Sequence, residues 1–357
     1  MTTAPAIPTR PASPGSRGGA GRALRQSSRR RRVLWLALLC AALAAMMLIS
    51  IAVGSRTVGW DDIVAALGGS ADGFDQAAVA KRIPRTLLAA AAGAALALSG
   101  AVMQGVTRNP LADPGILGVN TGASLAVVTG IAFFGLTSAT SYLIVAILGG
   151  AVTAALVYAI GSLGRGGATP LKLALAGTAT SAALISFTSA IILGRANLAD
   201  SIVSWQIGGV GGGTFAALEN MLPFLVIGTL VCWACARALN TLALGDEIAA
   251  GLGERVGAAR AVSAFGAVAL ASVATAVCGP IGFVGLVVPH ACRLISGVDH
   301  RWLLPYSAVV GALLLITADV LGRIIARPEE IDVGIITALI GAPVFIAIVR
   351  RATVREL

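Results

Sequence analysis

Ten apolar runs follow one another along the chain and are separated by short polar or Gly- and Pro-rich connections. A helix that crosses roughly 30 Å of hydrocarbon needs about 20 mostly apolar residues. The runs are continuous and do not alternate with a period of two residues, which favours helices over a β-barrel. The predicted spans are 33–53, 84–105, 114–134, 142–162, 171–194, 219–239, 258–278, 281–296, 303–325 and 333–350.

Two interruptions in this pattern stand out. The eighth run, "GPIGFVGLVVPHACRLI", is short and punctuated by Gly and Pro, so it is expected to be broken or partly re-entrant. Between the second and third runs, "TRNPLADP" ends one helix and begins the next, because proline stops a helix and fits the first turn of another. Asn109 and Asp113 are expected to shape this turn.

The composition agrees with an all-α polytopic membrane protein. Hydrophobic residues make up 57% of the 357 residues and charged residues only 12%, and the mean hydropathy is +0.89. The 44 glycines suit helices that pack closely through small residues, because lipid supplies no hydrophobic drive for helices to associate.

The basic residues orient the chain. Eight of the 26 lie in the first 32 positions, and cytoplasmic flanks are enriched in Arg and Lys. With an even number of spans, both termini are expected to be cytoplasmic. Residues 1–32 are predicted to be a disordered basic tail, 33–351 the membrane domain and 352–357 a short C-terminal tail. Nucleic-acid binding by the tail is the weaker alternative, since a span follows at once.

A secretory signal is the other alternative for the N-terminal region. However, the run 33–53 has no clear small-residue cleavage site before polar sequence returns, so it is expected to be an uncleaved first span. On the outer side, basic residues gather at 81–85 and 323–327, against the general rule, and this excess calls for its own explanation.

Two connections are long. The outer connection contains "GWDDIVAALGG", which predicts a short amphipathic surface helix. The inner stretch 240–257, "NTLALGDEIAAGLGERVG", predicts two short helical pieces broken at Gly245 and Gly253. It is too polar to insert and too apolar for an idle linker, which favours docking of a protein. The alternative is a helix that lies on the membrane surface.

Several kinds of chemistry have no support in the sequence. The only lysines are Lys81 and Lys172, and neither follows a glycine, so there is no Walker A motif and any ATPase must be a separate chain. Apart from Glu219 at the edge of one span, Asp319 is the only acid within a predicted span, and Arg323 lies one helical turn on, which favours a structural pair over proton coupling. The histidines and cysteines show no spacing typical of a metal, cofactor or catalytic site, so no cofactor or enzymatic activity is expected.

Three separated stretches carry a resemblance to one family: "RIPRTLLAAAAGAALALSGAVMQGVTRNPLADPGILGVNTGA", "GPIGFVGLVVPHACRLISG" and "PEEIDVGIITALIGAPVFIAIVRR". Together they resemble the FecCD-type permeases, which are membrane subunits of binding-protein-dependent ABC importers for ferric siderophores, haem and cobalamin. The resemblance covers roughly residues 33 to 351. It implies a type II ABC importer permease fold of ten helices in a bacterial cell membrane. The implied partners are a second permease subunit (homo- or heterodimer), two ABC ATPase subunits and an extracytoplasmic substrate-binding protein.

The resemblance also implies roles for individual residues. Acidic residues of the binding protein would be received by Arg82, Arg85 and Arg323; ordinary snorkelling is the alternative for residues 81–85. The ATPase coupling helices would use Gly245, Glu247, Ala249, Leu252, Gly253 and Arg255. The translocation path would be lined by Thr169, Pro170 and Leu171 at the inner gate and by Ser181 and Thr188 along the wall.

The function that follows is inward transport of a ferric siderophore, driven by ATP that a separate subunit hydrolyses. Haem or cobalamin as cargo is the alternative within the same family. An ion-coupled secondary transporter and a membrane-embedded enzyme are the alternatives from other classes.

Overall fold

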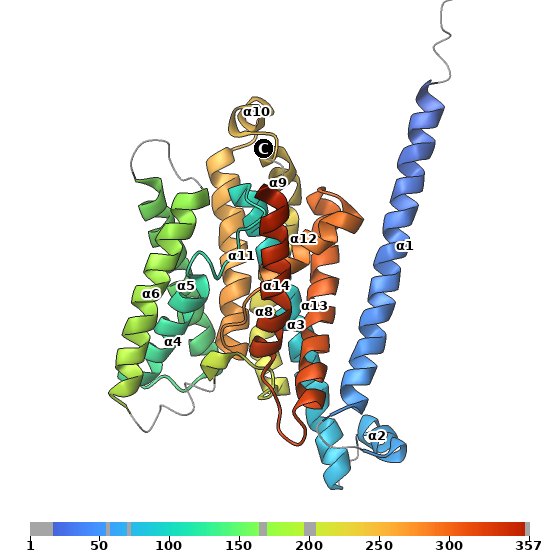
Figure 1. Cartoon of the computed structure of the whole chain (residues 1–357), viewed down its shortest axis with the longest axis vertical. Coiled ribbons are helices and arrows are strands. Elements are labelled where there is room, and N and C mark those ends of the chain that lie inside the picture. Colours follow the sequence, from blue (N-terminus) through green and yellow to red (C-terminus); the bar gives the residue numbers. More distant parts are fainter. Residues whose placement is uncertain (1–16, 55–57, 70–72, 164–169, 196–204, 354–357) are drawn as a thin grey trace, which may run out of the picture.

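The computed structural model describes residues 17–54, 58–69, 73–163, 170–195 and 205–353, and this part of the chain is helical without strands. Figure 1 shows the helices as a bundle in which the long members run side by side. Their bounds are α1 Arg17–Ala52, α2 Trp60–Leu67, α3 Phe74–Thr107, α4 Val119–Phe134, α5 Ala139–Ser162, α6 Pro170–Leu193, α8 Phe215–Ala234, α9 Ala236–Leu242, α10 Asp246–Gly251, α11 Val256–Cys278, α12 Val284–Ser296, α13 His300–Ile325 and α14 Val333–Thr353.

Each of the ten predicted runs coincides with one of these helices. Among the described residues, seven helices are long and apolar enough to cross a membrane, and three shorter apolar helices, α4, α12 and the first part of α14, accompany them. The all-α polytopic fold is therefore confirmed. In Figure 1, α1 begins and α14 ends at the end of the bundle that carries α9 and α10, and α2 lies at the opposite end. These are named below the α10 end and the α2 end.

The ends of the chain extend helices beyond the predicted spans. Residues 1–16 and 354–357 lie outside the described residues. From Arg17 onward the chain is part of α1, so the helix includes the second half of the segment 1–32 that was expected to be disordered. At the other end, α14 continues to Thr353.

Helix α3 is the centre of the bundle, and small residues let its neighbours approach it. It contacts α13, α11, α12 and α8, and most of its second half is buried. Gly93 faces the backbone of Gly311 in α13, and Gly100 faces the backbone of Gly285 in α12. A Cβ atom at either α3 position would collide with the facing carbonyl group. The backbones therefore meet directly, as the high glycine content predicted.

The two predicted interruptions take the expected form. In the connection after α3, the Asn109 carboxamide oxygen accepts from the Leu111 N–H at 3.0 Å, and Asp113 Oδ1 accepts from the Gly115 N–H at 2.7 Å. Both residues thus shape the turn. The eighth run is broken: residues 279–283 are not helical, and α12 has only 13 residues. The Gln104 side-chain amide donates to the Gly285 carbonyl at 3.1 Å.

The predicted surface helix is α2. Its Trp60 is 73% exposed, whereas Ile63 and Ala66 are buried against the bundle. One face therefore packs and the other is free, as the amphipathic pattern indicated.

We predict that Gly93→Leu lowers the thermal unfolding midpoint in detergent by several degrees, because overpacking a helix contact costs about 1–3 kcal/mol or more. Gly257→Ala is the matched control: it lies in the first turn of α11 with open space around its Cβ position, and it should leave the midpoint unchanged or raise it. An unchanged midpoint for Gly93→Leu would contradict the direct backbone contact. The measurement is thermal unfolding followed by circular dichroism.

Candidate functional site

The α2 end holds a buried ion network centred on Asp319 of α13. Asp319 Oδ1 accepts from Arg85 Nε at 3.0 Å and Nη2 at 2.7 Å, and Oδ2 accepts from Arg323 Nη2 at 2.6 Å. The Asp319 and Arg323 side chains are each only 1% exposed. The structural pair predicted from the spacing of these two residues is confirmed, and Arg85 joins it from α3.

Helix α1 ends on this network. The last carbonyl groups of α1 have no hydrogen-bond donor within the helix. Arg82 and Arg323 donate to them, and positive charge is favourable at the C-terminal end of a helix. Arg323 Nη1 donates to the carbonyls of Ser50 at 2.9 Å and Val53 at 3.0 Å, and Nη2 donates to Ser50 Oγ at 2.6 Å. Arg82 Nη1 donates to the Ala52 carbonyl at 3.0 Å.

These contacts determine how accessible the three arginines predicted to dock the binding protein are. Arg82 and Arg323 are 7% and 1% exposed, so their guanidinium groups lie inside the bundle. Arg82 donates to the end of α1, and Arg323 donates to both α1 and Asp319. Arg85 is the most accessible of the three, with 14% of its side chain exposed, and its Nη1 donates to Glu330 Oε2 at 2.6 Å. Lys81, one residue before Arg82, is exposed at the same end.

The α10 end carries the segment predicted to dock a protein. It consists of α9 and α10, with backbone breaks at Gly245 (φ +113°) and Gly253 (φ +86°), so the predicted two pieces are confirmed. Its apolar residues divide between two faces. Leu242 and Ala249 are fully buried against the bundle, whereas Leu244, Ile248 and Leu252 are 57%, 55% and 67% exposed. These three exposed residues are called the apolar ridge below.

The predicted coupling residues fall on both faces of this segment. Glu247, Leu252, Gly253 and Arg255 are exposed, Gly245 is half-buried and Ala249 is buried. Ala249 therefore anchors α10 to the bundle and cannot face a partner. Leu244 and Ile248 of the apolar ridge were not among the coupling residues that the family resemblance implied. The amphipathic character of 240–257 did indicate that this segment carries apolar residues for docking.

The predicted inner gate lies at the start of α6. Thr169 lies outside the described residues, and Pro170 is the first residue of α6. Leu171 is 69% exposed and lines a cavity of about 290 Å³ with the α3–α4 connection. The other lining residues include Thr107, Asn109, Leu117 and Phe345. Leu171, predicted for the gate, therefore faces the "TRNPLADP" turn between α3 and α4.

The two predicted wall residues lie on the packed side of α6. The Thr188 side chain is 3% exposed and its hydroxyl donates to the Leu184 carbonyl at 2.8 Å. Ser181 Oγ accepts from the Thr121 hydroxyl at 3.3 Å, so it faces α4. The hydroxyl groups on the exposed side of α6 belong to Thr178, Ser186 and Ser189.

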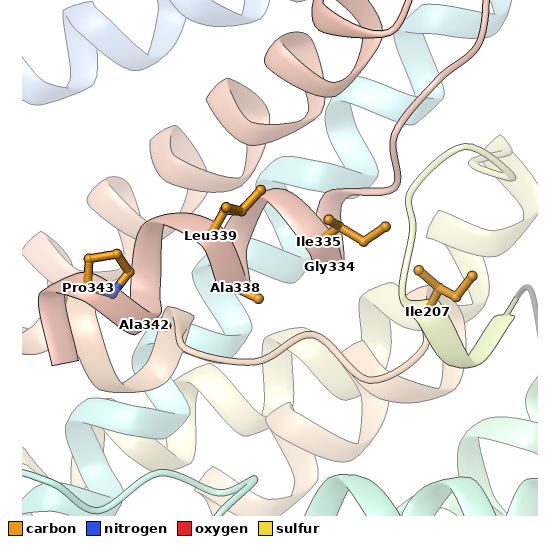
Figure 2. A pocket seen from close by; sticks show the side chains of 7 residues that line it. All are labelled: Ile207, Gly334, Ile335, Ala338, Leu339, Ala342 and Pro343. Carbon is orange, nitrogen blue, oxygen red and sulfur yellow. The ribbon is translucent and has the colours of Figure 1, made fainter. Parts of the chain in front are cut away.

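An open apolar groove runs along α14. Figure 2 shows the residues that line it: six from α14 and Ile207 from the segment before α8. The groove has a volume of about 590 Å³ and is lined by Ile207, Gly334, Ile335, Ala338, Leu339, Ala342 and Pro343. Side chains of this kind support apolar contact only. Within the described part of the chain, no group of three or more His, Cys, Asp or Glu residues could hold a metal ion.

The comparison with family models decides the family. The model of the FecCD transport family matches residues 41–351, which is most of the chain. The chain belongs to the FecCD transport family. FecCD proteins are non-catalytic membrane permeases of ABC transporters, and ATPase activity lies in a partner subunit.

Several FecCD relatives cover most of the chain. The probable siderophore transport system permease protein YfiZ of Bacillus subtilis (strain 168) is 40% identical, with 89% of this chain and 96% of the relative covered. The ferric enterobactin transport system permease protein FepD of Escherichia coli (strain K12) is 41% identical over 85% of this chain and 91% of the relative. The hemin transport system permease protein HmuU of Yersinia pestis is 39% identical over 76% and 82%.

A solved structure agrees with the fold. An ABC transporter of metal-chelate type in an inward-facing conformation superposes with a TM-score of 0.76 at 30% identity, covering 89% of this chain and 99% of the solved one. The FecCD permease fold predicted from the sequence is thereby confirmed.

We predict that Asp319→Asn sharply reduces the yield and thermal unfolding midpoint of the purified protein. Removing the one carboxylate between Arg85 and Arg323 leaves the buried Arg323 without its carboxylate partner, a loss of about 3–5 kcal/mol. Glu330→Gln is the control, because its partly exposed pair with Arg85 is worth about 1 kcal/mol or less. Equal midpoints for the two variants, measured in the same detergent, would show that the network is not structural.

Proposed function

We propose that this FecCD protein is the permease subunit of a binding-protein-dependent ABC importer that moves a ferric siderophore inward across a bacterial cell membrane. Relatives named for siderophore and ferric enterobactin transport cover most of its length, which supports this cargo over haem. The relative named for cobalamin import covers less of the chain. Ion coupling lacks support because Asp319, the one acid in the interior of a predicted span, is held by two arginines.

The observation that carries the proposal is the apolar ridge. Leu244, Ile248 and Leu252 are exposed on a segment whose other residues include Glu247 and Arg255, at an end of the bundle that lies beyond the membrane-spanning helices. Contiguous exposed apolar side chains with a polar rim mark protein interaction sites. The occupant that the family implies is the ATPase subunit. The apolar ridge would pack against the surface of the ATPase subunit. The backbone turns at Gly245 and Gly253 would orient the ridge toward it.

The proposed assembly is completed by a second permease subunit. The apolar groove along α14 and the exposed face of α6 offer it surface, and a path between two subunits would pass the start of α6. We place Thr169, Pro170 and Leu171 at the inner gate of this path. Ser181 and Thr188 would support its wall from the packed side of α6.

The α2 end would dock the binding protein. Arg85 is the accessible member of the arginine set and suits a carboxylate because its planar group can donate two hydrogen bonds. Arg82 and Arg323 would contribute their charge from inside the bundle and fix the ends of α1 and α13. Exposed Lys81 would add to the attraction.

The central experiment is reconstitution of the permease with its cognate ATPase and binding protein in liposomes. Uptake of a radiolabelled ferric siderophore should require ATP and the ATPase. Ile248→Asp should lower the affinity of the ATPase at least tenfold and abolish uptake, because a charge is placed in an apolar contact. Val64→Asp on α2, equally exposed at the opposite end, is the matched control and should keep both.

Three results would contradict the proposal. Uptake that persists without ATPase would exclude an ABC importer, and uptake that stops when the proton gradient is collapsed at constant ATP would favour a secondary transporter. Uptake of haem or cobalamin in preference to the siderophore would change the cargo.

We predict that Lys81→Glu weakens the affinity of the binding protein several-fold at low salt and less at high salt, because exposed charges are screened. Arg237→Glu, an exposed arginine at the α10 end, is the control and should leave this affinity unchanged. Surface plasmon resonance on the permease in nanodiscs measures both. Equal affinities for the two variants would exclude docking at the α2 end.

A further inference from the structure

Asp246, the first residue of α10, joins three elements at the α10 end. Its Oδ1 accepts from Arg260 Nη2 of α11 at 2.9 Å and pairs with the Arg108 guanidinium group at the end of α3. Both partners of the Asp246 side chain belong to the bundle and not to the apolar ridge.

Arg108 has an uncommon backbone conformation. It follows the last residue of α3 in the left-handed region, with φ +50° and ψ +31°, and its N–H bonds to the Gln104 carbonyl. Glycine is the usual residue at this position of a helix end, since other residues are strained there. Strain that persists at one residue points to a function for its side chain. Here the side chain forms the ion pair with Asp246.

The two arginines repel each other without Asp246. Burial lowers the pKa of Arg108, and the positive charge of Arg260 lowers it further. Both groups converge on the same carboxylate oxygen. The carboxylate thus binds the ends of α3 and α11 to the start of α10.

A second polar contact fixes α9 to α13. The Asn240 side-chain amide donates to Asp299 Oδ1 at 2.6 Å, and its oxygen accepts from the His300 backbone N–H at 2.9 Å. Asp299 also caps α13 by accepting from the Arg301 N–H at 3.0 Å. Burial alone would raise the pKa of Asp299, but these hydrogen bonds lower it overall, so the carboxylate stays charged.

We propose that Asp246 and Asn240 are positioning residues that make α3 and α13 follow any displacement of the apolar ridge. This inference rests on the proposed docking of an ATPase at that ridge. Gly245 and Gly253 flank α10 with turns that open space surrounds, and Ala249 packs α10 against the bundle through apolar contact. The polar contacts of Asp246 and Asn240 add fixed connections from this segment to α3 and α13. With these contacts, a displacement of α10 reaches α3 through the Asp246–Arg108 pair, and a displacement of α9 reaches α13 through the Asn240–Asp299 hydrogen bond.

The route continues to the other end of the bundle. Helices α3 and α13 meet backbone to backbone at Gly93 and Gly311, and at the α2 end Arg85 of α3 holds Asp319 of α13. A packed pair tied at both ends moves as one body, which is the physical requirement for coupling between distant sites.

The test is the ratio of cargo transported to ATP hydrolysed in liposomes that contain the permease, ATPase and binding protein. Asp246→Asn, Asn240→Ala and Arg108→Gly should each lower this ratio at least fivefold and leave the affinity of the ATPase within twofold. Asp246→Asn combined with Arg108→Gly should be no worse than Asp246→Asn alone, because Asp246→Asn already removes the pair with Arg108. Thr241→Ala is the matched control for Asn240→Ala and should keep the ratio, because the Thr241 hydroxyl donates to the Arg237 carbonyl of its own helix α9.

Arg108→Gly separates this role from a merely structural one. Glycine relieves the left-handed backbone, so its thermal unfolding midpoint should equal or exceed that of the wild type while the ratio falls. A wild-type ratio for Arg108→Gly would overturn the inference. Loss of ATPase binding in Asp246→Asn would also overturn it, by making Asp246 a contact residue. If the wild-type permease binds no ATPase, the proposed function itself fails, which is a separate result.

Discussion

The direct backbone contact of α3 with its neighbours is the constraint on which the rest of the structure depends. Lipid tails are as apolar as the helices, so association relies on close packing and hydrogen bonds rather than on removal of apolar surface from water. Gly93 and Gly100 let α13 and α12 reach the α3 backbone. Once these helices are in place, α11 and α8 pack around them, and α1, which is mostly exposed, attaches at the edge.

Polar groups within this bundle are placed where a backbone break or a helix end needs them. The Gln104 side-chain amide donates a hydrogen bond to a carbonyl at the start of α12, and Arg323 donates to one at the end of α1. Asp319 then balances the charge that Arg323 and Arg85 bring into the interior. Asp319 is thus occupied by two structural ion pairs, which argues against ion coupling through this residue.

The sequence predicted features that depend on neighbours along the chain and missed those that depend on distant partners. Apolar runs located the helices, prolines and glycines located the breaks, and spacing of four residues predicted the Asp319–Arg323 pair. The burial of Arg82 was not predictable, because its acceptors lie about 30 residues away at the end of another helix. The burial of Thr188 was not predictable either, because in a helix that is apolar all round the pattern does not show which face packs.

The same limit explains why the polar contacts of the α10 end escaped the sequence. In the sequence, Asn240 and Arg108 are polar residues near the ends of apolar runs. Only the fold brings Asn240 to Asp299 and Arg108 to Asp246. One local signal existed: the residue after a helix that ends "MQGVT" is where glycine is favoured, and this chain has arginine instead. A residue that breaks the local preference while its neighbours obey it has a reason elsewhere in the fold. Here that reason is a charge on the segment that presents the apolar ridge.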